Sequence, residues 1–543
     1  MSTIAAPPLD PRTGAPPPRT GGDLLAGDRA MRDALLREDG AEHLDETHAA
    51  GRAFATADAV ADGRDANIDV PTITGTAEVT LSPAYRATLR RAVEHGIAGA
   101  PWTDDRPGAH VARAARFVML AQAEAGVTCP MAMTYSCVPA LRLDDAVAAE
   151  WEPRVASRTF DGSERGPAQK DGAIIGMALT EASGGSDLAG LTTVARPTGD
   201  GAHLLSGEKW FVSAVHGDAF FVLARTDAGI GCFLVPRLRE DGAPNGFRIT
   251  ALKDKLGNRS NPTAEVTLDD AHGRIVGEEG RGVAAIMAMI AGTRIDCILG
   301  STGVMRLGVA EAIHHADHRH AFGRALSDQS AMTAVLADLA LEHEAAIASA
   351  LWLVRLAERG RAGDERAELL RRIASPTLKY WICKRAPIHA GEAMECLGGF
   401  GYMEDSRLAR AYREAPLMSI WEGSGNVQAL DVLRAVSRTP AVVDVLRDEL
   451  AGVRGEAPAL DRAIDELDAL LTADGLATAS PRDLTARIAL ALQAAVLVRG
   501  VPGPIADAFC ATRLPASAPG AFGVLPATVD AAAIVARHRP EEV

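Results

Sequence analysis

A segment of alternating apolar and polar residues interrupts an otherwise helical sequence, and this order constrains the fold more than any other feature. Between about Gly172 and Gly277, short runs such as HLLSGEKWFVSA, AFFVLART and AEVTLDD are separated by Gly, Asp, Asn and Pro. Such runs are typical of β-strands joined by turns. Ala-rich segments with helical spacing flank them, from about Ser82 to Ala149 and from about Arg281 to Arg434. The sequence therefore predicts a compact β-domain between two helical regions.

The length and composition allow several domains with a large core. The chain has 543 residues, of which 47% are apolar and 23% charged, as in an ordinary globular protein of about two to four domains. We place the expected domains at 1–27, a flexible Pro- and Gly-rich arm, 28–170, an N-terminal helical domain, 171–277, the β-domain, 278–438, a helical bundle, and 439–543, a helical C-terminal extension.

Cysteine spacing, hydropathy and charge exclude several classes of function. The seven cysteines form no CxxC pair and no Cys/His zinc pattern, so we expect neither a metal site nor a disulfide framework. We find no apolar run long enough to span a membrane and no signal-peptide pattern, and we expect a cytoplasmic protein without a membrane partner. The net charge of −15 disfavours wholesale attraction to nucleic acid.

Three stretches combine small residues, hydroxyls or aromatic rings in ways that suit a bound cofactor. In MALTEASGGSD, glycines lie beside the Thr180 and Ser186 hydroxyls, so that the backbone could approach a ring edge or a phosphate. In GEKWFVS, strand alternation places Phe211 and Ser213 on one face, where they could contact a planar ring. The glycines of GGFGY follow a helix and could admit a phosphate chain. Ordinary turns, strands and helix ends show the same patterns.

The histidine-rich run HHADHRH ends at His320 and resembles a metal site only at first sight. It lacks the carboxylate companions and the spacing of zinc motifs. We favour instead a role for Arg319, three residues before Phe322, as a bidentate phosphate contact.

The stretch SIWEGSGN places Glu422 between Trp421 and Gly423. A carboxylate beside apolar neighbours can have its pKa raised, which is what a general base requires. An ordinary surface glutamate fits the same pattern, so this stretch gains weight only from the cofactor-like stretches elsewhere in the chain.

Taken in order, these stretches resemble the acyl-CoA dehydrogenase flavoprotein family over about residues 82–435, and within it the AidB-like branch associated with the adaptive response to DNA alkylation. The segments that carry the resemblance are CPMAMTYS, IGMALTEASGGSD, GEKWFVS, LKDKLGNRSN, TRIDCILGS, SIWEGSGN and LDVLR. The resemblance implies a mostly helical α+β multidomain fold with an N-terminal helical domain, a central β-barrel and a C-terminal four-helix bundle, followed here by an extra helical domain. It implies FAD between the barrel and the bundle, and a homo-oligomer, with a tetramer favoured.

The resemblance also assigns roles to individual residues. Residues that match family positions contacting FAD are Met177, Leu179, Thr180, Gly185, Ser186, Phe211, Ser213, Arg319, Phe322, Gln329, Gly398, Gly399, Ser424 and Asn426. Of these, Arg319, Phe322 and Gln329 match the segment that reaches the FAD of a neighbouring subunit, which is why the resemblance implies a homo-oligomer. Glu395 departs from the Gln that is common before the double glycine. Glu422 matches the catalytic base, which would remove the proton alpha to a thioester carbonyl while flavin N5 accepts the beta hydride.

The substrate pocket is less defined by the resemblance. In the isovaleryl-specific branch the base lies at the position of Thr293, which is not acidic here. Arg294, Asp296 and Trp421 are our candidates for pocket residues. The sequence contains no separate CoA signature, so it leaves the acyl group open.

The leading prediction is an FAD-dependent oxidoreductase that acts on an acyl thioester or related small molecule, and two alternatives stay open. One is a DNA-associated flavoprotein of the alkylation response. From Val436 to Val543, however, ten Arg and no Lys stand against fourteen Asp plus Glu, a net charge of −4, whereas affinity for duplex DNA scales with cationic contacts. The other is a flavin-dependent oxygenase in a biosynthetic pathway.

Overall fold

A computed structural model describes residues 9–10, 14–19, 21–56, 73–74, 78–188, 190–199, 201–515 and 520–540. The chain divides into two compact units, and each is described by itself. Unit 1 comprises Met1–Val60, Pro107–Gln122 and Cys297–Val543, and unit 2 comprises Ala61–Arg106 and Ala123–Asp296. Each unit therefore contains segments from more than one of the domains expected from sequence.

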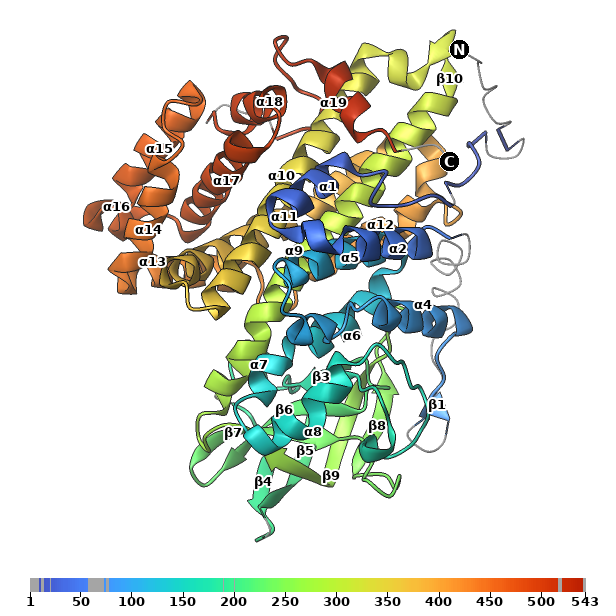
Figure 1. The fold of residues 1–543 in the computed structure, drawn as a ribbon, viewed down its shortest axis with the longest axis vertical. Coiled ribbons are helices and arrows are strands. Elements are labelled where there is room, and N and C mark those ends of the chain that lie inside the picture. The colour runs from blue at the N-terminus through green and yellow to red at the C-terminus, as the bar shows by residue number, and fades with distance from the viewer. Residues whose placement is uncertain are drawn as a thin grey trace. The chain divides into compact units, whose positions relative to one another are not determined.

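Unit 2 contains a β-barrel. Its strands are β3 (Ile175–Ala178), β4 (Val194–Pro197), β5 (Ala202–Ser213), β6 (Ala219–Thr226), β7 (Gly229–Pro236), β8 (Phe247–Leu252) and β9 (Thr263–Ile275). Their order is β3-β6-β4-β5-β9-β7, β8 pairs with β9, and β7 also pairs with β6, which closes the sheet on itself (Figure 1). Alternate side chains face the interior, where Phe220, Phe233 and Val266 are buried in one apolar core.

The helices of unit 2 pack on one another and on the barrel strand β3. They are α4 (Pro83–Glu94), α6 (Ala125–Ser136), α7 (Val138–Leu141) and α8 (Asp145–Ala156), with short 3-10 turns η2 (Ala100–Thr103) and η3 (Pro167–Gln169). The hydroxyl of Ser82 accepts a hydrogen bond from the amide of Tyr85, which caps the start of α4. A small strand pair, β1 (Ile73–Thr74) and β2 (Glu78–Val79), is also present. In α6, the Thr134 hydroxyl accepts from the amide of Ile175 at 3.1 Å.

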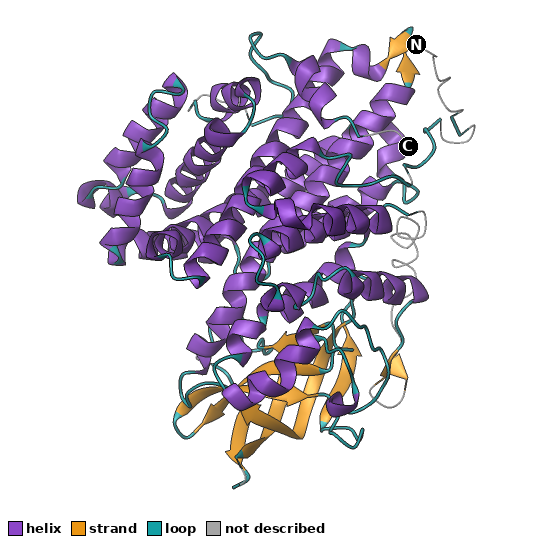
Figure 2. Ribbon diagram, viewed as in Figure 1, coloured by secondary structure: helices purple, strands orange, loops and turns teal. Residues whose placement is uncertain are grey.

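Unit 1 is helical (Figure 2). Its helices are α1 (Arg29–Arg37), α2 (Leu44–Phe54), α10 (Ser330–Arg361), α11 (Glu365–Glu395), α12 (Arg407–Glu414), α13 (Gly425–Arg438), α14 (Pro440–Ala451), α15 (Pro458–Leu470), α16 (Ala473–Thr478), α17 (Pro481–Gly500), α18 (Gly503–Arg513) and α19 (Ala531–His538). Short elements are η1 (Gly40–His43), β10 (His320–Ala321), β11 (Arg324–Ala325), η4 (Leu326–Asp328), η5 (Gly398–Tyr402) and η6 (Ala415–Ser419). The order of helical, β and helical regions predicted from sequence is confirmed.

Helices α5 (Ala109–Ala123) and α9 (Gly282–His318) have residues in both units. By length and composition α9 could cross a membrane, but 56% of its most apolar window is buried inside the protein. Its small residues allow close packing within unit 1, where a Cβ on Gly308 would lie 3.0 Å from the Cβ of Ala393 in α11. We therefore interpret α9 as a core helix.

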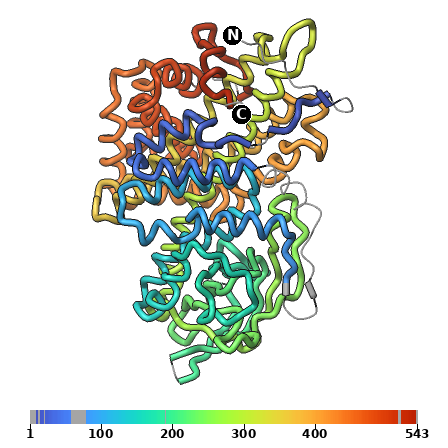
Figure 3. The backbone as a smooth tube through the Cα atoms, turned by 45° about the vertical axis from the view of Figure 1, so that its right-hand side comes forward, coloured from blue at the N-terminus to red at the C-terminus, as the bar shows by residue number. Residues whose placement is uncertain are grey.

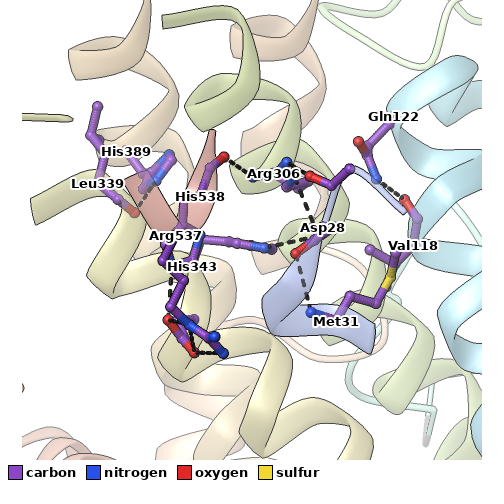
Figure 4. Close-up of polar contacts among 12 residues, drawn as sticks. Asp28, Met31, Val118, Gln122, Arg306, Leu339, His343, His389, Arg537 and His538 are labelled. Carbon is purple, nitrogen blue, oxygen red and sulfur yellow. Dashed lines mark hydrogen bonds and ion pairs between the residues drawn. The ribbon is translucent and has the colours of Figure 1, made fainter. Parts of the chain in front are cut away.

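The C-terminal extension packs on the bundle rather than forming a separate body. Helix α17 packs against α10, α11 and α13, and α19 packs against α10 and α1, so that the two ends of the chain lie side by side (Figure 3). A buried polar network joins them (Figure 4). Arg306 of α9 pairs with Asp28, the N-cap of α1, and donates to the carbonyl of His538. Glu344 of α10 pairs with Arg537 and His538.

Part of the segment that we expect to be a flexible arm is packed against unit 1. Ala15 and Leu25 are buried. His314 Nε2 lies 3.0 Å from the carbonyl oxygen of Pro17, and Arg319 donates to the carbonyl of Gly14 at 3.3 Å. Apolar burial and these backbone contacts hold the described part of the arm on the end of α9.

Candidate functional site

The predicted site residues are divided between the two units, so the geometry of each half is given in turn. On unit 2, Met177 is buried in β3, and Leu179 and Thr180 are half-buried directly after it. Gly185 and Ser186 are exposed on the same loop. A Cβ on Gly185 would lie 3.3 Å from the Cγ2 and 3.4 Å from the Oγ1 of Thr180. The structure therefore brings the Thr180 hydroxyl and the Gly185 backbone together, as the sequence predicted for a ligand-binding turn.

A buried ion pair holds this loop against β5. Lys209 Nζ donates to Glu181 Oε1 at 2.8 Å and to the carbonyl of Leu223 at 2.8 Å. The Glu181 carboxylate also accepts hydrogen bonds from the amides and hydroxyls of Thr192 and Thr193. Burial alone would raise the pKa of Glu181, but the hydrogen bonds from Lys209, Thr193 and Thr192 lower it to about 2. Both ends of the loop thus converge on one ionised carboxylate.

A β-bulge changes which side chains of β5 face outward. The register of β5 against β9 shifts between Lys209 and Val212, and as a result Trp210 and Phe211 are both exposed. Simple alternation predicted only Phe211 on the outer face. The Nζ of Lys253 lies 3.1 Å from the centroid of the Trp210 ring. Phe211 therefore has a second aromatic ring and a cation beside it.

The hydroxyl of Ser213 lies beside another polar group from the neighbouring strand. Ser213 Oγ lies 3.1 Å from Thr263 Oγ1, which accepts a hydrogen bond from Lys255 at 2.8 Å. The two hydroxyls and the ammonium form a donor set at the end of β5 and the start of β9. This set suits the hydrogen-bonding edge of a planar ring.

The candidate pocket residues of α9 include a buried carboxylate. Asp296 is buried and Arg294 is half-buried, on one helical turn of unit 2. Thr293 is buried and donates to the carbonyl of Ile290 at 3.1 Å, as helical threonines often do. The assignment of Arg294 and Asp296 to a substrate pocket stays a prediction.

On unit 1, three predicted FAD contacts lie on or beside one hairpin. Arg319 precedes β10, Phe322 lies between β10 and β11, and Gln329 follows η4. Gln329 donates to the carbonyl of Ala321 at 3.0 Å, which ties the segment to the hairpin. Phe322 is 96% exposed and has a φ of 54°. An aromatic ring this exposed on a left-handed residue is available to contact another molecule.

The double glycine is open to solvent, as its predicted role requires. Gly398 has a φ of 59°, and no atom lies within 4 Å of a Cβ built on Gly398 or Gly399. Glu395, which departs from the family pattern, is exposed. The backbone of η5 is thus accessible, although this geometry alone names no ligand.

The loop of residues 420–424, which we call the base loop, connects η6 to α13. Trp421 packs against the buried side chains of Cys297, Cys383 and Met418, and its Nε1 is buried without a hydrogen bond in the described part of the chain. Glu422 is half-buried and has a φ of 57°. Residues with such unfavourable backbone conformations cluster at functional sites. The left-handed conformation of Glu422, next to a packed tryptophan, is therefore consistent with a functional carboxylate.

Ser424 and Asn426 lie at the start of α13. Ser424 is the N-cap residue, but its side chain makes no capping hydrogen bond. Asn426 Oδ1 accepts from Arg482 Nε of α17 at 2.8 Å. The extension therefore reaches the candidate site through Arg482.

Sequence reasoning missed four residues at the site, namely Glu181, Lys209, Lys379 and Gln428. Lys379 donates to the base loop at the carbonyls of Trp421 and Gly423, and Gln428 donates to those of Glu422 and Gly423. A usable signal existed for the lysines. The chain has 56 Lys plus Arg, of which six are Lys and therefore fifty are Arg. Each lysine marks a position where a compact ammonium is present despite a strong bias towards arginine.

In the described residues, no group of three or more His, Cys, Asp or Glu is placed to hold a metal ion. The polar side chains at the predicted FAD positions are instead hydroxyls, two amides and an arginine, and the predicted Gly398 and Gly399 have open backbone. Hydroxyls and amides suit a flavin ring edge, and arginine suits a pyrophosphate. The residues present therefore fit FAD.

Comparison with known proteins places this chain among flavoprotein-like sequences. Three family models match in succession: Adaptive response protein AidB N-terminal domain over residues 15–162, Acyl-CoA dehydrogenase, middle domain, over 176–271, and Acyl-CoA dehydrogenase, C-terminal domain, over 280–437. AidB of Escherichia coli strain K12 is 38% identical over 508 residues, which cover 92% of this chain and 93% of AidB.

Two solved structures extend the comparison to the fold. ACDH-11 of Caenorhabditis elegans in complex with C11-CoA has a TM-score of 0.83 at 26% identity, covering 92% of this chain and 93% of that one. An acyl-CoA dehydrogenase of Bacillus anthracis complexed with FAD has a TM-score of 0.69 at 17% identity, covering 90% and 89%. The first aligns over nearly the whole chain.

Proposed function

Because the chain belongs to the acyl-CoA dehydrogenase family, on its AidB-like branch, we propose that it binds FAD and oxidises an acyl thioester, with Glu422 as the general base. The observation that carries this proposal is the base loop: a carboxylate on a left-handed residue between an anchored tryptophan and a glycine. The proposal is also supported by the relative that was solved with C11-CoA.

The chain's own residues divide the work in this proposal. Thr180, Ser186 and Ser213 on unit 2 would donate hydrogen bonds to FAD. On unit 1, Asn426 would contact the nucleotide part of FAD, and Arg319 would contact a phosphate of the FAD held by a neighbouring subunit. FAD, when bound, supplies the hydride acceptor. Glu422 would remove the proton alpha to the thioester carbonyl, and Trp421 would exclude water beside it.

The first experiment mixes the purified FAD-bound protein with a panel of acyl-CoAs in the absence of oxygen and follows the visible absorbance of oxidised flavin. We expect one class of acyl group to bleach the flavin, and Glu422→Gln to slow bleaching by roughly 10²–10⁴-fold. Glu365→Gln, an exposed glutamate at the start of α11, is the matched control and should react normally. Protein that holds FAD but reacts with no thioester would contradict the proposal.

A homo-oligomer, with a tetramer favoured, is part of the proposal, as is a cytoplasmic location. Support comes from apolar side chains on unit 1: Phe322 is 96% and Tyr402 82% exposed, and Ile388 and Tyr412 are also exposed. α11, η5 and α12, which carry the last three, pack on one another, so exposed apolar residues gather in one region, as at an interface. Light scattering coupled to gel filtration tests this, and a monomer would contradict it.

Association with DNA is a second candidate function, favoured by the similarity to AidB over 93% of that protein. The charges of the extension weigh against it. Of the ten arginines from Val436 to Val543, seven form ion pairs within the described residues, namely Arg447, Arg454, Arg487, Arg499, Arg513, Arg537 and Arg539. Arginines already paired with carboxylates contribute little to phosphate binding.

Salt-dependent binding of a fluorescent duplex separates the two candidates. Arg438 and Arg462 form no ion pair among the described residues, so an Arg438→Gln/Arg462→Gln variant removes cations without breaking internal pairs. Tight binding that weakens in this variant would favour the DNA function. Binding that is weak, and equal in the variant and the wild type, would leave the oxidoreductase as the one remaining candidate function.

A further inference from the structure

Three successive backbone carbonyls of the base loop point at two buried side chains. Lys379 Nζ of α11 donates to the carbonyl oxygen of Trp421 at 2.8 Å and to that of Gly423 at 2.6 Å. Gln428 Nε2 of α13 donates to the carbonyls of Glu422 and Gly423, both at 3.1 Å. Lys379 is 1% exposed and Gln428 is 0% exposed. Hydrogen bonds from two buried side chains therefore fix the backbone on both sides of Glu422.

These donors explain how the loop keeps an unfavourable backbone. Glu422 has a φ of 57° and Gly423 a φ of 103°. A left-handed conformation is unfavourable for a non-glycine residue. It persists only where the surroundings determine it, and here the bonds from Lys379 and Gln428 do so. Without them, Glu422 would be expected to relax to a more common conformation and its carboxylate to point elsewhere.

Hydrogen bonding alone does not account for a lysine at position 379. Its recorded partners are carbonyl oxygens, and no carboxylate pairs with it among the described residues. Burying an ammonium without a counter-ion is costly, and a neutral amide would satisfy carbonyls at lower cost. A further cation, Lys384, interacts unfavourably with Lys379 and with Arg482. A lysine is therefore present at a position that burial and the nearby Lys384 both make unfavourable for a cation.

The charge has one evident use, which is to act on the neighbouring carboxylate. We propose that Lys379 is a positioning residue for Glu422: it holds the base loop in the conformation that presents the carboxylate, and its ammonium favours the ionised form that can accept a proton. This inference rests on the proposed function of Glu422. Three cations lie near the loop, namely Lys379 and Lys384 of α11 and Arg482 of α17, and the charge of each favours the ionised carboxylate. The thiol of Cys383, which lies close to Lys379, is also titratable, and burial raises its pKa.

The test compares three variants of the FAD-bound protein. Lys379→Met removes both the hydrogen bonds and the charge, and Lys379→Gln removes the charge but keeps an amide donor. Arg372→Gln is the matched control: it lies on the same helix and also bridges to α13, but through Asp431 and not through the base loop. FAD content and thermal unfolding establish that each variant is folded.

Two measurements are made on each variant. The first is the rate of flavin reduction by the best acyl-CoA as a function of pH. We expect Lys379→Met and Lys379→Gln to move the rising limb of this profile to higher pH by about 1 unit, the lower end of the effect of a nearby opposite charge. The second is hydrogen exchange of the amides in residues 419–428, which should be faster in Lys379→Met than in the wild type and unchanged in Arg372→Gln.

The outcomes separate this inference from the proposed function. A uniform loss of rate with an unmoved pH profile in both Lys379 variants would show a purely structural lysine and overturn the inference. Unchanged hydrogen exchange in Lys379→Met would also overturn it, whatever the activity. Full activity in Glu422→Gln would overturn the proposed base, and with it any catalytic role for Lys379. An inactive Glu422→Gln together with normal Lys379 variants overturns this inference alone.

Discussion

Two loops of the candidate site are each held by a buried lysine, and the lysines differ in their partners. In unit 2, Lys209 donates to the Glu181 carboxylate and to one carbonyl. In unit 1, Lys379 donates to two carbonyls and has no carboxylate partner in the described part of the chain. Each lysine is 1% exposed. A paired ammonium leaves no net charge beside its loop, whereas an unpaired one leaves a full positive charge.

This difference in lysine partners matches the function that we propose for each loop. The loop after β3 has to offer neutral hydroxyls and backbone amides, for which a rigid frame without net charge is sufficient. The base loop has to present a carboxylate that accepts a proton, and a cation nearby favours the ionised form. The comparison suggests that the partner of a buried lysine shows whether it serves structure alone or also the charge of a neighbour.

Breaking the pair in unit 2 should give the largest change in stability. Glu181→Gln leaves Lys209 buried without a counter-ion, and we expect it to lower the free energy of unfolding by about 3–5 kcal/mol. Lys209→Met should cost a similar amount. Urea unfolding of the apoprotein measures both.

Two controls sharpen this prediction. The double variant Glu181→Gln/Lys209→Met should recover part of the loss, because no buried charge then lacks a partner. Glu265→Gln breaks the more exposed pair with Lys253 and should cost less than about 1 kcal/mol. Equal costs for Glu181→Gln and Glu265→Gln would mean that the buried pair does not hold the loop.

Acid should separate the two loops. The pKa of Glu181 is lowered from 4.5 to about 2, since hydrogen bonds to its carboxylate outweigh burial. A depressed folded pKa means that the ionised carboxylate stabilises unit 2 above pH 4.5 and that this contribution is lost as the pH falls towards 2. His216, whose pKa burial lowers from 6.5 to about 3, adds a loss in the same direction below pH 6.5, because the unfolded state binds its proton first.

The measurement is thermal unfolding between pH 7 and pH 3, with hydrogen exchange of residues 179–193 and 419–428 at each pH. We expect stability to fall with pH and the loop after β3 to lose protection before the base loop, whose recorded donors are a lysine and an amide. Glu181→Gln should show a weaker pH dependence below pH 4.5. Simultaneous loss of protection in both loops would contradict the comparison.

Much of this arrangement was predictable from sequence, because it depends on local pattern. Strand alternation located the β-domain, and the clustering of glycine and hydroxyls made Thr180 and Ser186 candidates for cofactor contacts. Glu422 stood out between a tryptophan and a glycine. These features are short-range, so periodicity and turn chemistry are enough to find them.

The residues that hold the loops were not predictable in the same way. Lys379 is 42 residues from Trp421, and Glu181 is 28 residues from Lys209. No spacing rule links partners that meet only after folding. The bulge that exposes Trp210 depends on how β5 pairs with β9, which a single strand does not reveal. The one available indication was that lysine is rare in a chain with fifty arginines. This rarity pointed to the positions of the lysines but not to the residues they contact.

A methyl group on the glycine of the base loop should have a moderate effect. Gly423 has a φ of 103°, and a Cβ there would lie 2.6 Å from Gln428 Nε2 and 3.0 Å from Val427 Cγ1. We expect Gly423→Ala to cost about 1–3 kcal/mol and to slow flavin reduction by displacing Glu422. Gly503→Ala is the control, because no atom lies within 4 Å of its Cβ. A fully active and stable Gly423→Ala would mean that the loop tolerates other conformations.

The smallest effect on stability should come from the proposed base itself. Glycine adopts a left-handed backbone without the steric cost that Glu422 bears at a φ of 57°. We therefore expect Glu422→Gly to abolish flavin reduction and yet to leave the free energy of unfolding within about 1 kcal/mol of the wild type. Glu422→Gln keeps the strained residue and serves as the control for loss of charge alone. If Glu422→Gly were instead as destabilising as Glu181→Gln, then Glu422 would be a structural residue like Glu181. The proposed contrast, in which Glu181 stabilises its loop whereas Glu422 is held in place to accept a proton, would then be wrong.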